Sequence, residues 1–344
     1  MRRNGFSRKP PQWWVRTSFA MSTVVFGVIT GLLTEILKLS VGGGLWALTA
    51  VLAALTVLSL LPWGRILPGG DSTESSRLGI ILHLHSKDEA PSSQYPAALE
   101  HAKSTHQVVE RIDRVLPRAG NKRSAEIRKA YENFHELVTK HESTSTPTAL
   151  YSIARLPDAY EFGRHLRYEL GSPTVMQADS GKDSEPFFPA VRLNRRLSQP
   201  LSANERTRVE RLLTTEERVF TAAESPERIA LIIALAPSNI AAEAAEAART
   251  GRHEHYAIAS GEKCDAALII SAAPEGIPRQ GEIFELVVRH VRQQWTEWLG
   301  AQGHPAERLL FLGTPASVGV AVGYLFSRER IRLVPYQSPA VTTR

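Results

Sequence analysis

Two apolar runs open the chain, and a different pattern follows them. Thr17 to Leu39 is broken only near its end, by Glu35 and Lys38, and Leu45 to Leu61 forms a second, shorter run. A helix that crosses a bilayer needs about 20 mostly apolar residues. The pattern therefore predicts a two-helix transmembrane hairpin within residues 1–65, with helices at about 17–39 and 45–61.

Three residues of the first run indicate more than a simple anchor. Gly27 and Gly31 are spaced as in motifs that let membrane helices approach closely. Glu35 is costly inside a bilayer, so it either pairs with Lys38 and reaches the outer interface, or lines an oligomeric pore. We expect Gly27, Gly31 and Glu35 to serve membrane association.

The flanking charges predict the orientation. Residues 1–65 carry seven Lys and Arg residues against Glu35 alone, so this segment accounts for the whole formal net charge of +6. Most of these cations precede the first run, which favours a cytoplasmic N-terminus and, after two crossings, a cytoplasmic remainder. A cleaved signal peptide is the alternative, but the second run and the missing Ala-x-Ala end disfavour it. Since the remainder is electrically balanced, a broad nucleic-acid-binding surface is not expected.

After a polar linker at 66–77, short apolar strands alternate with amphipathic helices. Strands are expected at 78–85, 149–154, 174–178, 228–235, 255–259, 266–271, 308–312 and 330–334. Helices are expected at 96–116, 123–140, 159–170, 239–250, 282–299 and 316–326, with a loop at 179–189 and a charged helical connector at 204–220. Such alternation predicts an α/β fold with parallel sheets, arranged as tandem Rossmann-like halves at 78–200 and 201–344.

In sheets of this kind, ligands bind beyond the carboxyl ends of the strands. Several of these ends combine Pro or Gly with a small hydroxyl residue just before a helix, which offers backbone N–H groups to a phosphate. The candidate ligand-binding residues are His83, His85, Ser86, Arg155, Pro157, Pro237, Ser238, Asn239, Pro274, Glu275, Thr314, Pro315 and Ser317, with Arg332 as a cation and Tyr336 as a stacking surface.

The stretch from Phe311 to Phe326 resembles a phosphate loop only superficially. No Lys follows its glycines, and their spacing is not that of a dinucleotide-binding turn. Gly319 and Gly323 are expected to let the helix pack tightly on the sheet.

The residues that bind metals are sparse. Cys264 is the single cysteine, which excludes an intramolecular disulfide and a CxxC zinc site. His83-x-His85 and His253-x-His255 each point one way on a strand, but no third ligand is apparent nearby. We therefore expect surface or pocket histidines, no metal and no cofactor.

Three segments resemble SAVED domains: "YSIARLPDAYEFGRHLRYEL", "ALIISAAPEGIP" and "LLFLGTPASVGVAVGYLFSRERIRLVPY". The resemblance spans about Leu78 to Tyr336. It implies two fused CARF-like halves that bind a cyclic oligonucleotide second messenger, made by a partner nucleotidyltransferase in CBASS antiphage defence. The hairpin in front resembles the transmembrane effectors of those systems.

That resemblance implies a non-catalytic effector of the bacterial inner membrane, in which ligand-induced homo-oligomers disrupt the lipid. The chain departs from this expectation in having few cations in its loops, with Arg155 and Arg332 the nearest candidates. Ring size, bases and linkage of the ligand therefore stay open, as does the choice between a defined pore and general membrane disruption.

Two other classes of function compete with this reading. One is a membrane-tethered nucleotide-processing enzyme acting on the messenger, although the sequence shows no paired carboxylates with a supporting His and no nucleophile elbow. The other is a structural membrane protein whose Rossmann-like part binds a protein partner. A DNA or RNA polymer is not an expected partner.

Overall fold

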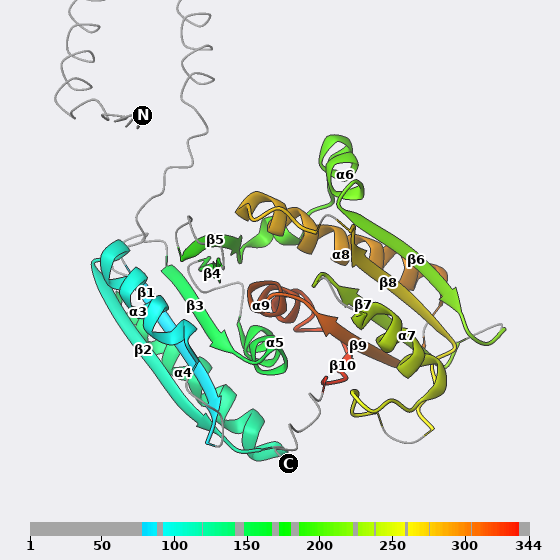
Figure 1. Ribbon diagram of the computed structural model, residues 1–344, viewed down its shortest axis with the longest axis horizontal. Helices are drawn as coiled ribbons and strands as arrows, with labels where there is room; N and C mark the ends of the chain where they lie inside the picture. Colours follow the sequence, from blue (N-terminus) through cyan, green and yellow to red (C-terminus); the bar gives the residue numbers. More distant parts are fainter. Residues whose placement is uncertain are drawn as a thin grey trace, which may run out of the picture. The chain divides into compact units, whose positions relative to one another are not determined.

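The computed structural model describes residues 78–87, 92–118, 120–141, 148–166, 172–179, 186–222, 226–236, 239–258, 261–274, 276–303 and 305–336 (Figure 1). No helix within these ranges is long and apolar enough to cross a membrane. The predicted hairpin, with Gly27, Gly31 and Glu35, lies outside the described residues. So do three candidate ligand-binding residues: Pro237, Ser238 and Glu275.

The first half of the described chain forms a five-stranded sheet. Its strands are β1 (Leu78–Ser86), β2 (Val108–Leu116), β3 (Thr148–Ala154), β4 (Thr174–Ala178) and β5 (Phe187–Arg192). They lie in the order β2-β1-β3-β4-β5, and only the β4–β5 pair is antiparallel.

The second half forms another five-stranded sheet. Its strands are β6 (Leu213–Val219), β7 (Arg228–Ala234), β8 (Ala266–Ala272), β9 (Glu307–Gly313) and β10 (Arg332–Leu333), in the order β10-β9-β7-β8-β6. Only β6, which pairs with β8, is antiparallel. Without the antiparallel edge strands β5 and β6, each sheet is a parallel four-stranded unit in which the first strand of the half lies beside its second and third. The fold is therefore mixed α/β, with two similarly built halves.

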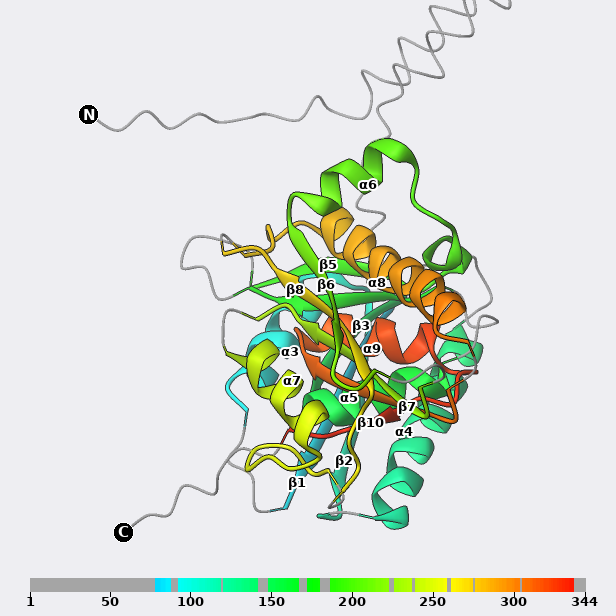
Figure 2. The same ribbon diagram turned by 90° about the vertical axis from the view of Figure 1, so that its right-hand side faces the viewer.

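The helices repeat in step with the strands. They are α3 (Gln94–Thr105), α4 (Asn121–His141) and α5 (Leu156–His165) in the first half, and α7 (Ile240–Thr250), α8 (Gly281–Ala301) and α9 (Ala316–Leu325) in the second. A short 3-10 helix, η1 (Arg195–Ser198), and α6 (Ala203–Glu210) lie between them in the chain. Helices α3 and α7 each cover what we call the outer face of their sheet and lie toward the same side in Figure 2. Helices α4, α5, α8 and α9 pack on the opposite faces, in one core that both sheets share.

Alternation within the central strands explains this layering. One face of β1 points into the core that both sheets share, and its residues there are Leu78, Ile80, Leu82 and Leu84. On the opposite face, Ile81 points into the small outer core under α3. A strand buried on both faces is expected in a parallel sheet with helices on each side.

Helices α5 and α9 join the two halves. Each has glycine at its eighth position, and each glycine lies against the carbonyl group of the fifth residue of the other helix: Gly163 against Val320, and Gly323 against Tyr160. Leu156, the first residue of α5, lies against Gly319, the fourth of α9. These contacts require the two helices to run in the same direction, and Figure 1 shows them next to each other. We expected Gly319 and Gly323 to let the helix pack on the sheet. That expectation is wrong, because both glycines lie against helix α5 instead.

Three edge strands were not expected from the sequence. The predicted helix 96–116 is in fact α3 followed by β2, the end of the predicted loop 179–189 belongs to β5, and the connector 204–220 is α6 followed by β6. All three strands lie at sheet edges. Charged, solvent-facing positions in β2 and β6, and Pro189 in β5, remove the pattern by which a central strand is recognised.

One predicted strand is absent from the described residues. At 255–258 the chain makes a single bridge, between Tyr256 and Tyr336, in place of the strand expected at 255–259.

Candidate functional site

The carboxyl ends of the parallel strands form two rims. We call the ends of β1, β2 and β3 the first rim, and the ends of β7, β8 and β9 the second rim. Helix α5 starts directly after the first rim and α9 directly after the second. Because these helices run side by side in the same direction, their N-termini lie next to each other.

Both N-termini lack a side-chain cap. The N-cap residues, Arg155 of α5 and Pro315 of α9, accept no hydrogen bond through their side chains. The exposed helix α6 is different: the Ser202 hydroxyl accepts from the Glu205 N–H, and the Glu205 carboxylate accepts from the Ser202 N–H at 2.9 Å. A helix N-terminus carries unsatisfied N–H groups and partial positive charge. The first turn of α5 already holds one carboxylate, Asp158, whose charge is balanced by Arg123. The paired ends of α5 and α9 thus favour an anion.

The Glu205 carboxylate is kept charged by Arg289 as well as by the cap. The hydrogen bond from Arg289 and, after it, those from Ser202 lower the pKa of Glu205 to about 2. This carboxylate occupies the position that an anionic ligand would take at an uncapped helix.

Four sequence candidates meet at this junction. Arg155 and Pro157 lie at the start of α5, and Thr314 and Pro315 at the start of α9. Arg155 is exposed and the other three are half-buried, so a ligand can reach them.

Ser317 has another role. It is 1% exposed, and its hydroxyl donates to Oε1 of Gln177 on β4 at 2.7 Å. Because this bond ties α9 to the first sheet, Ser317 contributes to the junction between the halves, and we leave it out of the proposed ligand site.

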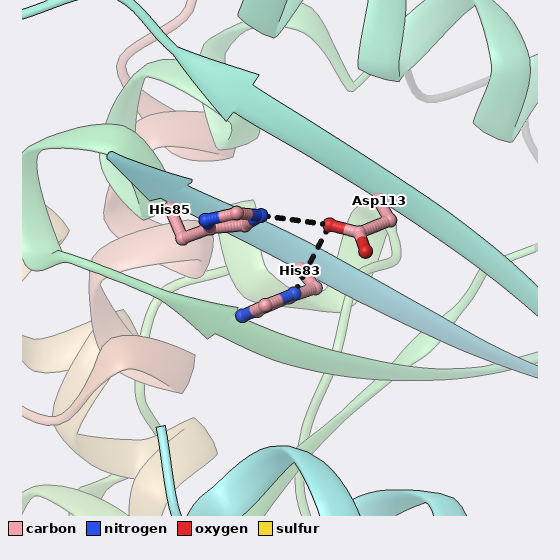
Figure 3. A group of neighbouring side chains, drawn as sticks. All are labelled: His83, His85 and Asp113. Carbon is pink, nitrogen blue, oxygen red and sulfur yellow. Dashed lines mark hydrogen bonds and ion pairs between the residues drawn. The ribbon is translucent and has the colours of Figure 1, made fainter. Parts of the chain in front are cut away.

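The first rim carries a polar cluster on the outer face of its sheet. His83 Nδ1 and His85 Nε2 each lie 3.1 Å from Oδ1 of Asp113 on β2 (Figure 3). The two imidazole rings stack with centroids 4.4 Å apart, and the Tyr95 ring packs on His83 at 4.6 Å. The expectation that no third ligand atom lies near His83 and His85 is wrong, because Asp113 supplies one.

Asp113 was missed because its segment was read as helix. The sequence did contain an indication of a strand here, because β-branched residues favour strands and this segment has four: Val108, Val109, Ile112 and Val115. Ser86, the remaining candidate ligand-binding residue of this rim, is the last residue of β1 and is buried.

The second rim has a pocket instead of a polar cluster. The pocket is lined by Ala234, Ala236, Ala241, Ser271, Ala272, Ala273, Pro274 and Gly276. Of the sequence candidates, Pro274 lines this pocket, and Asn239 is the N-cap residue of α7 beside it; both are exposed.

Strand register shows that the cluster and the pocket occupy equivalent places. His83 pairs with Ile153, three residues before α5, and Ala234 pairs with Gly313, three residues before α9. Across the other neighbour, His83 pairs with Asp113 and Ala234 with Ser271. His85 then corresponds to Ala236, and Tyr95, the second residue of α3, to Ala241, the second of α7.

Two further candidates lie apart from the helix junction. Arg332 pairs in register with Leu309 and forms ion pairs with Glu262 and with Glu307, the first residue of β9. It therefore lies toward the amino end of β9, away from the rim, and we leave it out of the proposed site.

Tyr336 belongs to an aromatic group beside the second sheet. Its ring lies 5.5 Å from His255 and 5.3 Å from Tyr256, measured between centroids. Burial raises the pKa of Tyr256, so its phenol stays neutral at physiological pH. Tyr336 is 40% exposed and offers a stacking surface.

No protein-family model matches the chain, and no curated protein does. Among solved structures, the chain is similar to the SAVED/CARF-domain containing receptor Cap4 of Acinetobacter baumannii, alone and with the cyclic trinucleotides 2'3'3'-cAAA or 3'3'3'-cAAA. Identity is 13% in all three, and the TM-scores are 0.39, 0.40 and 0.41 respectively for the receptor alone, with 2'3'3'-cAAA and with 3'3'3'-cAAA. The matches cover 76% of this chain, which spans about half the length of the receptor. With identities and TM-scores this low, the cyclic trinucleotides are ligands of Cap4, and the comparison assigns no ligand to this chain.

Proposed function

We propose that the chain is a membrane-anchored receptor and effector for a cyclic oligonucleotide, with the ligand bound where the N-termini of α5 and α9 meet. The observation that carries this proposal is the pair of uncapped helix N-termini, held side by side by Gly163 and Gly323. The resemblance of the sequence to SAVED domains supports the same ligand class.

A ring with several phosphates suits this arrangement. Each helix N-terminus presents N–H groups and partial positive charge to one phosphate. Two such ends side by side bind two phosphates of one ligand, so few cationic side chains are needed. Arg155, exposed at the start of α5, adds one.

The second rim offers room for a base. Its pocket is lined mostly by alanines. Their small side chains leave space for a flat ring and offer no hydrogen-bonding groups to the edge of a base. Stacking of a base on an aromatic side chain contributes about 1–3 kcal/mol, and the half-exposed Tyr336 is such a surface in the second half.

The N-terminal segment supplies the effector activity in this proposal. The two predicted spans anchor the chain in the inner membrane with the described residues in the cytoplasm. Ligand binding promotes homo-oligomers of the cytoplasmic part, and the gathered hairpins then disrupt the membrane. The chain performs no chemistry on its ligand.

A panel of cyclic di-, tri- and tetranucleotides tests the proposal on the purified full-length chain. The cyclic trinucleotides named with Cap4 are the first to try. One member of the panel should raise the melting temperature and increase the oligomer size, and it should be recovered unchanged after prolonged incubation. Absence of binding across the panel refutes the receptor, and a hydrolysed ligand supports the nucleotide-processing enzyme.

A charge placed at the helix junction tests the position of the site. Thr314→Glu adds a carboxylate where the phosphate is proposed to lie, so ligand affinity should fall about tenfold or more, since each 1.4 kcal/mol of repulsion is a factor of ten. The matched control is Ser93→Glu, which places the same charge at the exposed N-cap of α3. Equal affinity for both variants would locate the ligand elsewhere.

A further inference from the structure

We propose that His83, His85 and Asp113 form a binding site for a divalent transition-metal ion. Each residue offers one ligand atom, and the three atoms lie within 4.8 Å of one another. Figure 3 shows both imidazoles directed at the same carboxylate from one side of the sheet. This proposal does not depend on the proposed function.

The sheet itself sets the spacing of the three residues. His83 and His85 are two apart on β1, so their side chains share one face, and His83 is the register partner of Asp113 on β2. All three therefore project from paired strands, whose backbone positions are fixed more closely than those of loops.

Two of the three separations between ligand atoms suit an ion with short bonds. Both ring nitrogens lie 3.1 Å from Oδ1 of Asp113, and ligand atoms around a tetrahedral zinc with bonds of 2.0–2.2 Å are about 3.3–3.6 Å apart. The two rings are only 19° from parallel, so one imidazole must turn about its Cβ–Cγ bond for both nitrogens to face the ion. That torsion is broad in histidine.

The ligand set selects the class of ion. Two imidazole nitrogens with one carboxylate oxygen suit zinc or ferrous iron, whereas magnesium and calcium prefer oxygen ligands alone. The Asp113 side chain is 56% exposed and those of His83 and His85 are 12% and 27% exposed. Three protein ligands at a surface this open leave a coordination position for water or an anion.

The rest of the described chain provides a natural comparison. His83, His85 and Asp113 are the only group of three such residues found within the described ranges. His253-x-His255 has the same spacing in sequence, and its rings lie 5.5 Å apart, but it belongs to no group of three among those residues.

Zinc binding by the full-length chain, with any purification tag removed, tests the site directly. After equilibrium dialysis against Zn²⁺ with excess Mg²⁺, metal analysis should find one zinc per chain above the background of a His83→Gln/His85→Gln variant. The exposed Asp113→Asn change should weaken binding about tenfold or more, because even residues that only support a metal ligand have effects of 10–100-fold. Cobalt in place of zinc should give visible d–d bands that disappear in the same variants.

The matched control is His253→Gln/His255→Gln, which should retain the ion and the cobalt bands. Circular dichroism and thermal melting establish that each variant is folded. The proposal is overturned if the wild-type chain retains no zinc, if excess Mg²⁺ displaces it, or if binding survives Asp113→Asn and the His83/His85 change. Loss of binding in the His253/His255 control also overturns it.

Discussion

The two rims share a backbone and differ in chemistry. Where the first rim has His83, His85, Asp113 and Tyr95, the second has Ala234, Ala236, Ser271 and Ala241 at equivalent positions. The large polar side chains fill one place with a bonded cluster, and the small ones leave a pocket in the other. Strand order therefore fixes where a site can form, while side-chain size and polarity decide what it binds.

A similar contrast exists at the third position of the two joining helices. In α5 this residue is Asp158, which is buried and receives two hydrogen bonds from Arg123, at 2.6 and 2.7 Å. In α9 it is the fully buried Val318. One fold accommodates either an ion pair or an aliphatic side chain at the same point.

Breaking that ion pair is expected to have the largest effect on stability. Asp158→Val leaves the Arg123 guanidinium without its carboxylate and should destabilise the fold by about 4 kcal/mol. Arg123→Met/Asp158→Val should recover most of this loss, because a buried ion pair can often be replaced by apolar residues at little cost, as Val318 illustrates. Denaturant unfolding of the three chains measures both values. A double variant as unstable as the single one would show that the two helices are not equivalent at this position.

The two joining glycines should behave alike. A Cβ at Gly163 or Gly323 overlaps a backbone carbonyl of the other helix, so each change to Ala should cost about 2–3 kcal/mol. Gly300 of α8, whose added Cβ meets no atom within 4 Å, is the control and should lose no stability on change to Ala. Melting temperatures report the result. A loss at only one of the two positions would contradict the symmetric crossing of α5 and α9.

Transferring the polar cluster to the second rim should produce a smaller effect. Starting from one zinc per wild-type chain, Ala234→His/Ala236→His/Ser271→Asp should bind a second, weaker ion. The pocket provides the room, but Ala241 gives no ring to pack on the new histidine as Tyr95 does on His83. Metal analysis at saturation counts the ions. A folded variant that still binds one would contradict the equivalence of the rims.

The sequence predicted the centre of each sheet better than its edges. Central strands such as β1, β7 and β9 are apolar on both faces, so they were found within one or two residues of their bounds. Edge strands β2, β5 and β6 carry charges or prolines on the open side, and periodicity does not separate them from helix or loop. Missing β2 meant missing Asp113, and so the third ligand atom.

The candidate site was predictable in part for a related reason. Loops that follow central strands could be located, which gave Arg155, Pro157, Thr314 and Pro315 at the helix junction. The sequence could not show that Ser317 points into the first half, or that Arg332 lies toward the other end of β9, because both depend on contacts between distant segments. Whether these loops bind a nucleotide stays a prediction.

Because both rims belong to one polypeptide, the two edges that a bound ring would contact are different. A pair of identical halves would present two equal edges, and a ring of unlike nucleotides could enter it in two orientations. Here every molecule presents one edge of each kind, in a fixed order along the chain. In the function proposed above, such a receptor would hold an asymmetric ring in a single orientation and distinguish it from its reverse.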